Sequence, residues 1–502
     1  MLARVTTGAI YGLEGIKVTV EVDVSLRGFP GFTIVGLPNK AVDEAKERVR
    51  TAIANTGFSM PDARITVNLA PANIPKSGSG YDLAIALGIL AASGEVRQES
   101  LENKLFIGEL SLRGEIRKVS GIIPVIILAQ QEKIDELYIP QDNESDTILF
   151  SGATIYPVKH LQDVIAYINH DKEPIPFIPP HSKKQITEDV AYDFADIKGQ
   201  EQAKRALEIA ATGFHNIHLK GPPGAGKTFL SRAFPSILPL LEEEELLEVS
   251  KIYSVIDSLH TTLFEGVRPF RSPHHTTSQV GLIGGGTNPR PGEISLAHRG
   301  VLFLDEFPEF PRNVLESIRQ PMEDGVVTVS RASGSVTFPA RFLLVAASNP
   351  CPCGYFGHPN KQCTCLPGNI ARYQKKLSGP LLDRIDLHVD VAPVEVEKLS
   401  TFDAGETSVR VRERVLSGRK VQKKRFAKTS INFNGEMSST MVQEFCHLTG
   451  EAQSLLNRAT EKLSLSARSY FKTIKVSRTI ADLAGDTRIE KRHIAEALQY
   501  RP

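Results

Sequence analysis

A phosphate-binding loop is indicated by residues 221–228, which read Gly-Pro-Pro-Gly-Ala-Gly-Lys-Thr and fit the pattern G-x-x-x-x-G-K-[ST]. Glycines let backbone N–H groups close around phosphate oxygens, and the helix that follows such a loop adds its positive end. We expect Lys227 to reach the β- and γ-phosphates of a nucleotide and the Thr228 hydroxyl to bind Mg²⁺. The nucleotide-binding candidates are Gly221, Pro222, Pro223, Gly224, Ala225, Gly226, Lys227 and Thr228.

The segments on either side of this loop fit the motif. Residues 217–220 are a short apolar piece that predicts a strand, and residues 229–233 can open a helix. A strand, a glycine loop and a helix are the context that a phosphate loop needs. A glycine-rich turn before a helix is the alternative, but here every position of the motif is filled.

Carboxylates with a possible role in nucleotide hydrolysis follow the apolar residues 301–304. Those residues predict a buried strand of a parallel sheet, and α/β folds place ligands at the C-terminal ends of such strands. Asp305 is expected to hold Mg²⁺, directly or through water, and Glu306 to orient and polarise the attacking water. A second apolar strand at residues 342–348 ends in Asn349, which can bridge the γ-phosphate and that water or simply begin a turn.

A cluster of cysteines predicts a metal site. Cys351, Cys353, Cys363 and Cys365 form two C-x-C pairs around a nine-residue loop. In a reducing compartment this spacing favours a tetrahedral Zn²⁺ site of four thiolates over disulfides. The pairs are tighter than the usual C-x₂-C, so reduced cysteines in a polar loop are the alternative. His358 is a spare ligand.

The elements that position these residues predict an α/β protein of several domains. The chain has 502 residues, 41% of them hydrophobic and 23% charged, which is ordinary for globular proteins. Its net charge of +1 means that any basic surface must be local. We expect a cytoplasmic protein, since the N-terminus lacks a signal-peptide pattern and the longest apolar run, residues 122–129, is too short for a bilayer. The predicted domains are an N-terminal domain (1–170), a proline-rich linker (171–192), a motor core (193–395) containing the cysteine loop (351–365), and a helical lid (396–502).

The N-terminal domain resembles that of the Lon proteases and related motors. The residues that carry the resemblance are 71–84, PANIPKSGSGYDLA, and 107–116, IGELSLRGEI. The resemblance implies a Lon-protease-like (ribosomal S5-like) α+β fold. Lon uses a Ser–Lys dyad, and by hand alignment its serine position falls on Gly80 and its lysine position on Ile123. Because both reacting groups are missing, a scaffold is favoured over a peptidase.

The chain as a whole resembles the YifB/ComM family, the Mg-chelatase-like AAA+ ATPases of bacteria. Besides the motifs above, the resemblance rests on residues 268–277, RPFRSPHHTT, on the glycine-rich residues 281–286 and on residues 292–300. It implies a degenerate Lon-type domain, an AAA+ P-loop core and a helical lid. ComM proteins act as hexameric helicases that drive branch migration during natural transformation, and the resemblance implies that activity in homologous recombination here. The spacings themselves indicate only an ATPase.

The resemblance to AAA+ proteins assigns further roles around the nucleotide. Ile197 and Gly199 are expected against the adenine base, and Asn349 takes the sensor-1 position. Arg478 is the expected sensor-2 arginine of the lid, which would close on the nucleotide of its own chain, with Arg468 as the second choice.

Arg384 takes the position of an arginine finger, which reaches the ATP of the neighbouring subunit and therefore requires an oligomer. A guanidinium suits this task because it is planar, permanently charged and forked toward phosphate oxygens. An ion pair with Asp383 or Asp386 is the alternative reading of Arg384.

Contacts with DNA are predicted at two places. Residues 281–292 resemble the helix-2 insert that faces the pore of the ring, and residues 326–338 read as a strand, a turn and a strand where the pre-sensor-1 hairpin belongs. Arg331 near the hairpin tip can bind phosphates without reading sequence. Arg331 is equally compatible with a solvated hairpin. A second basic run is residues 419–425, in the lid, where a solvated face is favoured over a DNA contact. The DNA-binding candidates are Arg331, Lys423, Lys424 and Arg425.

Three functions are compatible with these patterns. A DNA-translocating AAA+ motor, probed by DNA-stimulated ATP turnover, is favoured. A chelatase-type ATPase that remodels a protein partner is the alternative, and its turnover would be indifferent to DNA. A Lon-like ATP-dependent protease is disfavoured by the missing dyad.

Overall fold

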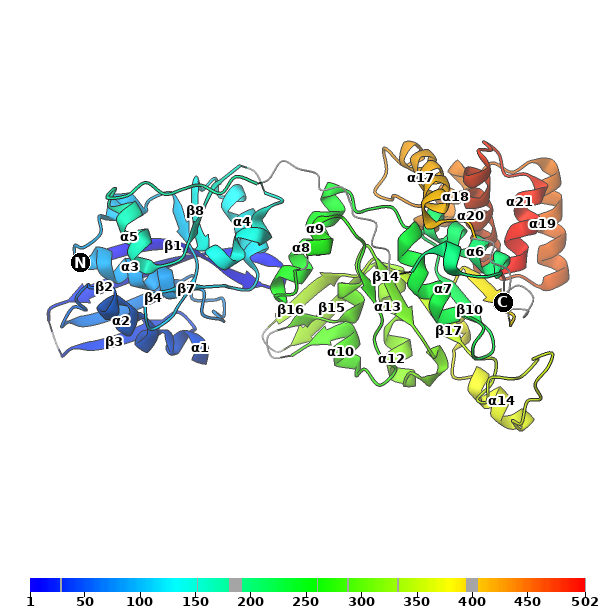
Figure 1. The fold of residues 1–502 in the computed structure, drawn as a ribbon, viewed down its shortest axis with the longest axis horizontal. Coiled ribbons are helices and arrows are strands. Elements are labelled where there is room, and N and C mark those ends of the chain that lie inside the picture. Colours follow the sequence, from blue (N-terminus) through cyan, green and yellow to red (C-terminus); the bar gives the residue numbers. More distant parts are fainter. Residues whose placement is uncertain are drawn as a thin grey trace. The chain divides into compact units, whose positions relative to one another are not determined.

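The computed structural model describes residues 1–27, 29–150, 152–179, 192–259, 261–286, 289–331, 334–393 and 405–501 (Figure 1). The chain divides into two compact units. Unit 1 comprises residues 1–185 and 243–265, and unit 2 comprises residues 186–242 and 266–502. Most of the predicted linker, residues 180–191, lies outside the described residues.

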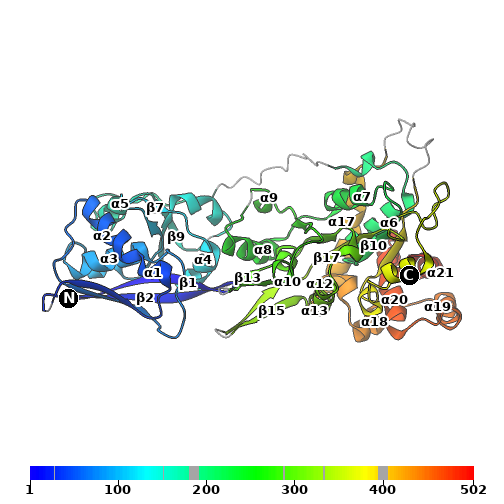
Figure 2. The same ribbon diagram turned by 90° about the horizontal axis from the view of Figure 1, so that it is seen from below.

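Unit 1 is built on a seven-stranded mixed sheet with strand order β3-β4-β2-β1-β5-β8-β9. Its first two strands form the long antiparallel hairpin seen in Figure 2. Their alternating residues bury one face, as period-2 patterning requires. The strands are β1 (Leu2–Tyr11), β2 (Glu14–Ser25), β3 (Gly31–Val35), β4 (Arg64–Ala70), β5 (Lys104–Phe106), β8 (Glu136–Pro140) and β9 (Thr154–Val158), with a separate small hairpin of β6 (Glu109–Leu110) and β7 (Ile116–Arg117).

The helices of unit 1 complete its core. The one that is apolar all round, α3 (Asp82–Ala92), is buried along its whole length, as such a sequence predicts. Glu44 separates the first two helices, α1 and α2. The helices are α1 (Lys40–Asp43), α2 (Ala45–Asn55), α3, α4 (Ile122–Gln131), α5 (Leu161–Ile168), α8 (Glu243–Val255) and α9 (Thr261–Phe264).

The last two of these helices come from within the sequence range predicted as the motor core, yet in space they belong to unit 1. Helix α8 packs against α4: the backbone N–H of Ile123 donates to Ser254 Oγ at 3.2 Å, and that of Gly121 donates to the Ser254 carbonyl at 2.8 Å. Lys118 forms an ion pair of 2.9 Å with Asp257. The apolar side of α8 explains why this segment is retained by unit 1, since Leu247 joins the core around α4.

Unit 2 contains a five-stranded parallel sheet with the order β11-β14-β17-β10-β18. Its strands are short and nearly all buried, which is typical of a sheet covered on both faces. Parallel strands end at the same edge, so the residues after β10, β14 and β17 meet there. The strands are β10 (Ile217–Lys220), β11 (Phe270–Arg271), β14 (Val301–Leu304), β17 (Leu343–Ser348) and β18 (Leu387–Asp390).

Two small hairpins and several short helices surround this sheet. The strand–turn–strand prediction is confirmed, because β15 (Val326–Arg331) and β16 (Gly334–Pro339) pair antiparallel. The glycine-rich insert forms a second hairpin of β12 (Gly284–Gly285) and β13 (Arg290–Pro291). The helices are α6 (Glu201–Gly213), α7 (Lys227–Ala233), α10 (Gln279–Ile283), α11 (Glu293–Leu296), α12 (Arg312–Ser317), α13 (Arg319–Asp324), α14 (Pro367–Gln374) and α15 (Gly379–Leu382).

The C-terminal part of unit 2 is the helical lid. Val411, Val415, Val476 and Ile480 of its helices join the core that surrounds the sheet, so lid and sheet share one hydrophobic cluster. The lid helices are α17 (Ser408–Arg425), α18 (Ser439–Phe445), α19 (Gly450–Leu463), α20 (Ala467–Ala484) and α21 (Lys491–Ala497). Among the described residues, every helix falls short of the length and apolarity needed to cross a membrane.

Candidate functional site

The phosphate loop connects the buried strand β10 to helix α7. Gly224 and Gly226 have φ values of 78° and 90°, in the left-handed region that side chains disfavour. A Cβ at Gly221 would lie 2.2 Å from the carbonyl oxygen of Val391, so the close approach of β18 requires glycine there as well. The glycines of the motif are therefore needed by the backbone path that aims the N–H groups into the loop.

Lys227 lies at the first position of α7 with its ammonium group inside the loop. Its Nζ donates to the carbonyl oxygens of Gly221 and Pro222 at 2.7 and 2.9 Å and to Asn349 Oδ1 at 3.1 Å. Burial lowers the pKa of Lys227, and the nearby charge of Asp305 opposes that shift. Lys227 after β10 and Asn349 after β17 thus meet, because these two parallel strands are neighbours in the sheet.

The two predicted Mg²⁺ ligands also meet. Thr228 Oγ1 donates to Asp305 Oδ2 at 2.8 Å, across the edge where β10 and β14 end. Hard oxygen ligands of this kind suit Mg²⁺, which takes few protein ligands and keeps several waters. The hydroxyl and the carboxylate therefore fit the ion that the motif implies, together with nucleotide phosphates.

Glu306 projects into solvent beside this pair. Its backbone is left-handed, with φ 51°, and its N–H donates to Asp305 Oδ1 at 2.9 Å. His275 Nδ1 lies 3.3 Å from Glu306 Oε2. The sequence did not predict that His275 pairs with Glu306. The pairing arises because β11 and β14 are neighbours and end at the same edge.

The segment predicted to face adenine borders the loop. Ile197 is buried, and Gly199 has a φ of 63°. The next residue, Gln200, donates from Nε2 to the carbonyl oxygens of Ala225 at 3.1 Å and Ala392 at 2.6 Å. These bonds hold the segment beside the phosphate loop, and its contact with the base stays a prediction.

Arg384 lies at the opposite edge of the sheet from the phosphate loop of its own chain. Asn216, which precedes β10, donates from Nδ2 to the Arg384 carbonyl at 3.2 Å, whereas the loop follows β10. The guanidinium forms an ion pair of 2.5 Å with Glu323, and Arg468 shares that carboxylate at 2.8 Å. Glu323 therefore replaces the alternative partners that the sequence suggested.

These two arginines line a cavity of about 530 Å³ at that edge. Two lysines of α20, Lys472 and Lys475, line it too, and burial lowers the pKa of both. Arg341 and four carboxylates complete the charged lining, so cations and anions are nearly balanced there; the carboxylates are Glu323, Asp324, Asp386 and Glu436.

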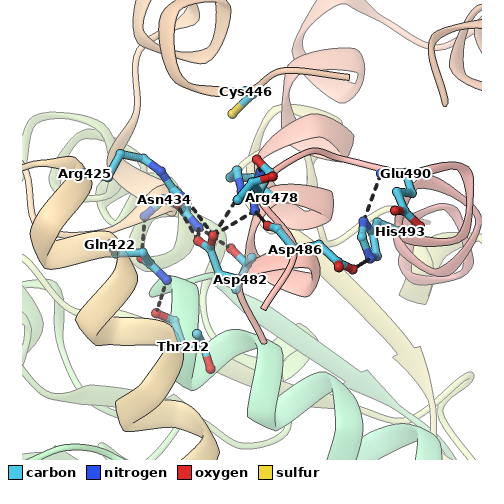
Figure 3. A network of polar contacts seen from close by, with 12 residues as sticks. Thr212, Gln422, Arg425, Asn434, Cys446, Arg478, Asp482, Asp486, Glu490 and His493 are labelled. Carbon is cyan, nitrogen blue, oxygen red and sulfur yellow. Dashed lines mark hydrogen bonds and ion pairs between the residues drawn. The ribbon is translucent and has the colours of Figure 1, made fainter. Parts of the chain in front are cut away.

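The position of Arg478 does not fit the predicted contact with nucleotide. Its side chain is 1% exposed and lies within the lid, where it pairs with Asp482 at 3.0 Å and donates to the backbone carbonyls of Asp486 and Thr487 (Figure 3). A guanidinium that is buried and engaged in this way stabilises the lid. The second choice, Arg468, is 43% exposed and lies beside Arg384.

The same lid network accounts for one of the DNA-binding candidates. Arg425 donates to Asn434 Oδ1 at 2.8 Å and to both carboxylate oxygens of Asp482 (Figure 3). Its guanidinium is therefore committed to the lid interior and is a poor candidate for DNA. Lys424 is exposed, and Lys423 forms an ion pair of 2.8 Å with Glu242.

Arg331, the other DNA candidate, ends β15 and is exposed. Its guanidinium lies against the glycine-rich insert, since a Cβ at Gly285 would be 3.0 Å from Nη2. The structure thus places the predicted hairpin against the insert that was predicted to face a pore. Part of each turn, residues 287–288 and 332–333, lies outside the described residues.

The four clustered cysteines converge. Their Sγ atoms all lie within 4.8 Å of one another, with separations of 3.4 Å (Cys351–Cys353), 3.5 Å (Cys353–Cys363) and 3.7 Å (Cys351–Cys363). Tetrahedral Zn²⁺ with bonds of about 2.3 Å needs sulfur–sulfur edges of about 3.8 Å, so the cluster matches that geometry. Backbone N–H groups of Tyr355 and Thr364 lower the pKa of the Cys353 thiol, whereas burial and the neighbouring cysteines raise the pKa of Cys363 and Cys365.

The cysteine loop also touches the phosphate loop. Gly354 has a φ of 84°, and a Cβ there would lie 2.4 Å from Cδ of Pro223. This close approach explains the glycine after the second cysteine. No sequence pattern indicated it, because the two loops are adjacent only where β10 and β17 end together.

The Lon-like segment of unit 1 presents no comparable site. Gly80 and Ile123 are the residues that the hand alignment places at the dyad positions, and Ile123 is fully buried in α4. Lys76 is fully buried and donates from Nζ to the Pro71 carbonyl. Asp82 is bound by Arg48, whose Nε lies 2.7 Å from Oδ2. These polar residues satisfy one another inside the fold.

Three family profiles match three different parts of the chain. The family described as "Magnesium chelatase, subunit ChlI" matches residues 193–399, "Subunit ChlI of Mg-chelatase" matches residues 20–143, and "Magnesium chelatase, subunit ChlI C-terminal" matches residues 405–501.

Several curated proteins are similar to the chain. "Competence protein ComM" of Haemophilus influenzae is 45% identical over 100% of this chain and 97% of its own length. "Uncharacterized protein YifB" of Escherichia coli K12 is 42% identical with the same coverage. "Lon protease 2" of Bacillus subtilis is 27% identical over 36% of this chain and 34% of its own length.

Proposed function

The chain belongs to the ComM/YifB family of Mg-chelatase-like AAA+ proteins, and from this premise we propose that it is an ATP-driven motor acting on DNA. The family implies ATP and Mg²⁺ as cofactors. The observation that carries the proposal is the convergence of Lys227, Thr228, Asp305 and Asn349 at one edge of a parallel sheet, with Glu306 beside them.

Each of these groups has a task in hydrolysis. The loop N–H groups and Lys227 bind and orient the phosphates, while Thr228 and Asp305 would hold Mg²⁺. The ion neutralises charge on the phosphates when bound. Glu306 orients and polarises the attacking water from its exposed position. Asn349, whose Oδ1 accepts a hydrogen bond from Lys227, positions the γ-phosphate.

A ring, which we propose to be a hexamer, follows from the placement of Arg384. This residue lies across the sheet from its own phosphate loop, so its phosphate partner would come from a neighbouring subunit. Arg468 shares Glu323 with Arg384 and is the lid arginine placed to act with it. A nucleotide phosphate arriving there would compete with Glu323 for both guanidinium groups.

DNA as the substrate is supported by the family and by two hairpins. The relative from Haemophilus influenzae carries the name of a competence protein, and we infer a role of this chain in natural transformation and homologous recombination, as a helicase that promotes branch migration. The β15–β16 hairpin with Arg331 lies against the glycine-rich insert, where a pore contact with a DNA strand would be made.

The decisive experiment measures ATP turnover with no DNA, with single-stranded DNA and with branched DNA. We expect stimulation by DNA, and no turnover in Lys227→Ala under any condition. Turnover that is indifferent to every DNA form would favour the alternative, an ATPase that remodels a protein partner as its matched chelatase profiles suggest. Strand displacement on a branched substrate then tests helicase action.

We propose further that the four-cysteine loop binds one Zn²⁺. The set of four thiols and the separations of their sulfur atoms suit that ion. Such a site can contribute about 10–16 kcal/mol of apparent binding free energy at neutral pH, enough to order a loop with little core of its own.

Metal content measured on the purified chain tests the zinc site. We expect about one zinc ion per chain and its loss in the Cys351→Ser/Cys365→Ser variant. The matched control is Cys446→Ser, because Cys446 is buried in the lid core and stands apart from the cluster. Unchanged metal content after the double substitution would contradict the site.

A further inference from the structure

A cavity of about 630 Å³ lies between helix α14 and the segment that begins at Glu309. Four cations line it, Arg312 on one side and Arg372, Lys375 and Lys376 on the other, against the single carboxylate of Glu309. Figure 1 shows α14, in yellow, at the margin of the ATPase core. The groove therefore has an unbalanced positive charge, although the whole chain is nearly neutral.

The charge in this groove is available to a ligand. Lys376 and Glu309 form an exposed ion pair of 3.0 Å. Within the part of the chain that the structure describes, Arg312, Arg372 and Lys375 form no ion pair. Surface cations are normally interspersed with carboxylates, and a cleft with an excess of positive charge concentrates polyanions by focusing the field.

Helix α14, which forms one wall of the groove, is anchored to the residues that follow β17. Helix α14 begins just after Cys365, and Gln374 Nε2 donates to the Pro350 carbonyl at 3.2 Å. Tyr373 of this helix is buried, and its side chain has a hydrogen bond with the backbone of Asn349. Arg372 and Lys375 are three residues apart, so they lie close together on one side of the helix, and both are exposed. Two fixed, neighbouring cations on a rigid element are a suitable receptor for successive phosphates.

We propose that this groove binds the phosphodiester backbone of DNA. The inference rests on the proposed function and adds a contact site distinct from the Arg331 hairpin and from the lid lysines. Contacts between Arg or Lys and phosphate are independent of base sequence, as a motor that moves along DNA requires. An acidic protein segment would be the other polyanion, and the experiment below separates the two.

The groove adjoins the hydrolytic carboxylate. The 3₁₀ turn at Phe307–Glu309 starts directly after Glu306, and the Glu309 N–H donates to the Glu306 carbonyl at 2.7 Å. A DNA phosphate in the groove competes with Glu309 for Lys376. Occupation of the groove therefore acts on a turn that begins at the residue that orients the attacking water.

The test measures binding of a fluorescein-labelled single-stranded oligonucleotide by fluorescence anisotropy between about 50 and 200 mM salt. The variant is Arg372→Glu/Lys375→Glu on the full chain, with Arg372→Gln/Lys375→Gln as a milder version. We expect Kd to rise at least about tenfold and the slope of log Kd against log salt to fall by about 1.4, since two phosphate contacts are lost.

The matched control is Arg458→Glu/Lys462→Glu, which makes the same change of charge on exposed residues of α19. It should keep the wild-type slope, and zinc content reports that the neighbouring loop of the groove variant is intact. Wild-type protein that binds DNA while the groove variants match it in Kd and slope would overturn this inference alone. Wild-type protein without DNA binding would overturn the proposed function as well. Displacement of DNA by polyglutamate as effective as by unlabelled DNA would overturn the choice of ligand.

Discussion

Two loops of this molecule have the same local design and different outcomes. In unit 2, β10 leads through a glycine-rich loop into α7, and in unit 1, β4 leads through residues 71–81 into α3. Each carries a buried lysine, Lys227 in the first and Lys76 in the second. Lys227 meets a side chain from another strand, Asn349, whereas Lys76 donates to a backbone carbonyl five residues away.

The difference shows what turns a glycine loop into a site. At the unit 2 loop, three parallel strands end together, so Asp305 and Asn349 join the loop residues. At the unit 1 loop, Asp82 is enclosed and is neutralised by Arg48, with a further hydrogen bond from the Leu110 N–H at 3.2 Å. Polar groups that satisfy one another stabilise a fold, while polar groups that converge at an open edge remain available for a ligand.

The largest difference between the two regions is expected in ATP turnover when one carboxylate in each is replaced by an amide. Glu306→Gln should lower ATP turnover by about 10²–10⁴-fold while ATP still binds, because the amide cannot polarise the attacking water. Glu109→Gln, at the carboxylate that accepts from Ser79 in the Lon-like region, should leave turnover unchanged. Steady-state turnover and nucleotide binding measured on both variants provide the check. Equal losses in the two variants would break the comparison.

A second expectation concerns the buried ion pair of unit 1. Arg48→Met leaves the fully buried Asp82 without its partner, and we expect a loss of about 3–5 kcal/mol in the stability of that unit. Hydrogen-exchange protection of α3 amides in the full chain reports this loss. Arg50→Met is the control, since Arg50 is half exposed and lies 4.0 Å from Glu47. ATP affinity should stay at the wild-type value, because Asp82 has no part in the nucleotide site.

The third expectation is that acid affects the two units in opposite directions. Burial lowers the pKa of His218 to about 3 and that of His388 to about 4, so the unfolded chain binds protons that the folded unit 2 does not. Unit 2 therefore loses stability as pH falls below about 6.5, by up to about 1.4 kcal/mol per pH unit for each histidine.

The pKa shift of Asp82 changes the stability of unit 1 in the opposite direction. Burial raises the pKa of Asp82 to about 6, although the nearby charge of Arg48 lowers it. Between about pH 6 and 4, Asp82 is therefore protonated in the folded unit 1 and ionised in the unfolded chain. Unit 1 gains stability over that range. Hydrogen exchange at α3 and at β17, compared at pH 7 and about pH 5.5, tests the pair of shifts. His218→Gln should remove the part of the acid-induced loss of stability in unit 2 that comes from this histidine. Equal changes of protection in α3 and β17 would contradict the opposite pH dependence of the two units.

The sequence determined the local motifs because their chemistry is written in consecutive residues. The phosphate loop, the apolar strand before Asp305, the β15–β16 hairpin and the four cysteines were each recognisable from type and spacing alone. The prediction that the Ser–Lys dyad is missing came instead from the resemblance to the Lon proteases. The full-length similarity to Competence protein ComM agrees with the family that these motifs indicated.

Only the tertiary structure decided which polar residues face a site and which face the core. Arg468 and Arg478 lie on the same lid helix, and the resemblance to AAA+ proteins favoured Arg478, yet its guanidinium is buried among lid residues. The pairing of His275 with Glu306 and the approach of Gly354 to Pro223 depend on strand order in the sheet. Helix α8 belongs to unit 1 although its sequence lies between motifs of unit 2. Burial and partner choice are set by residues far apart in the chain, and no local spacing carries that information.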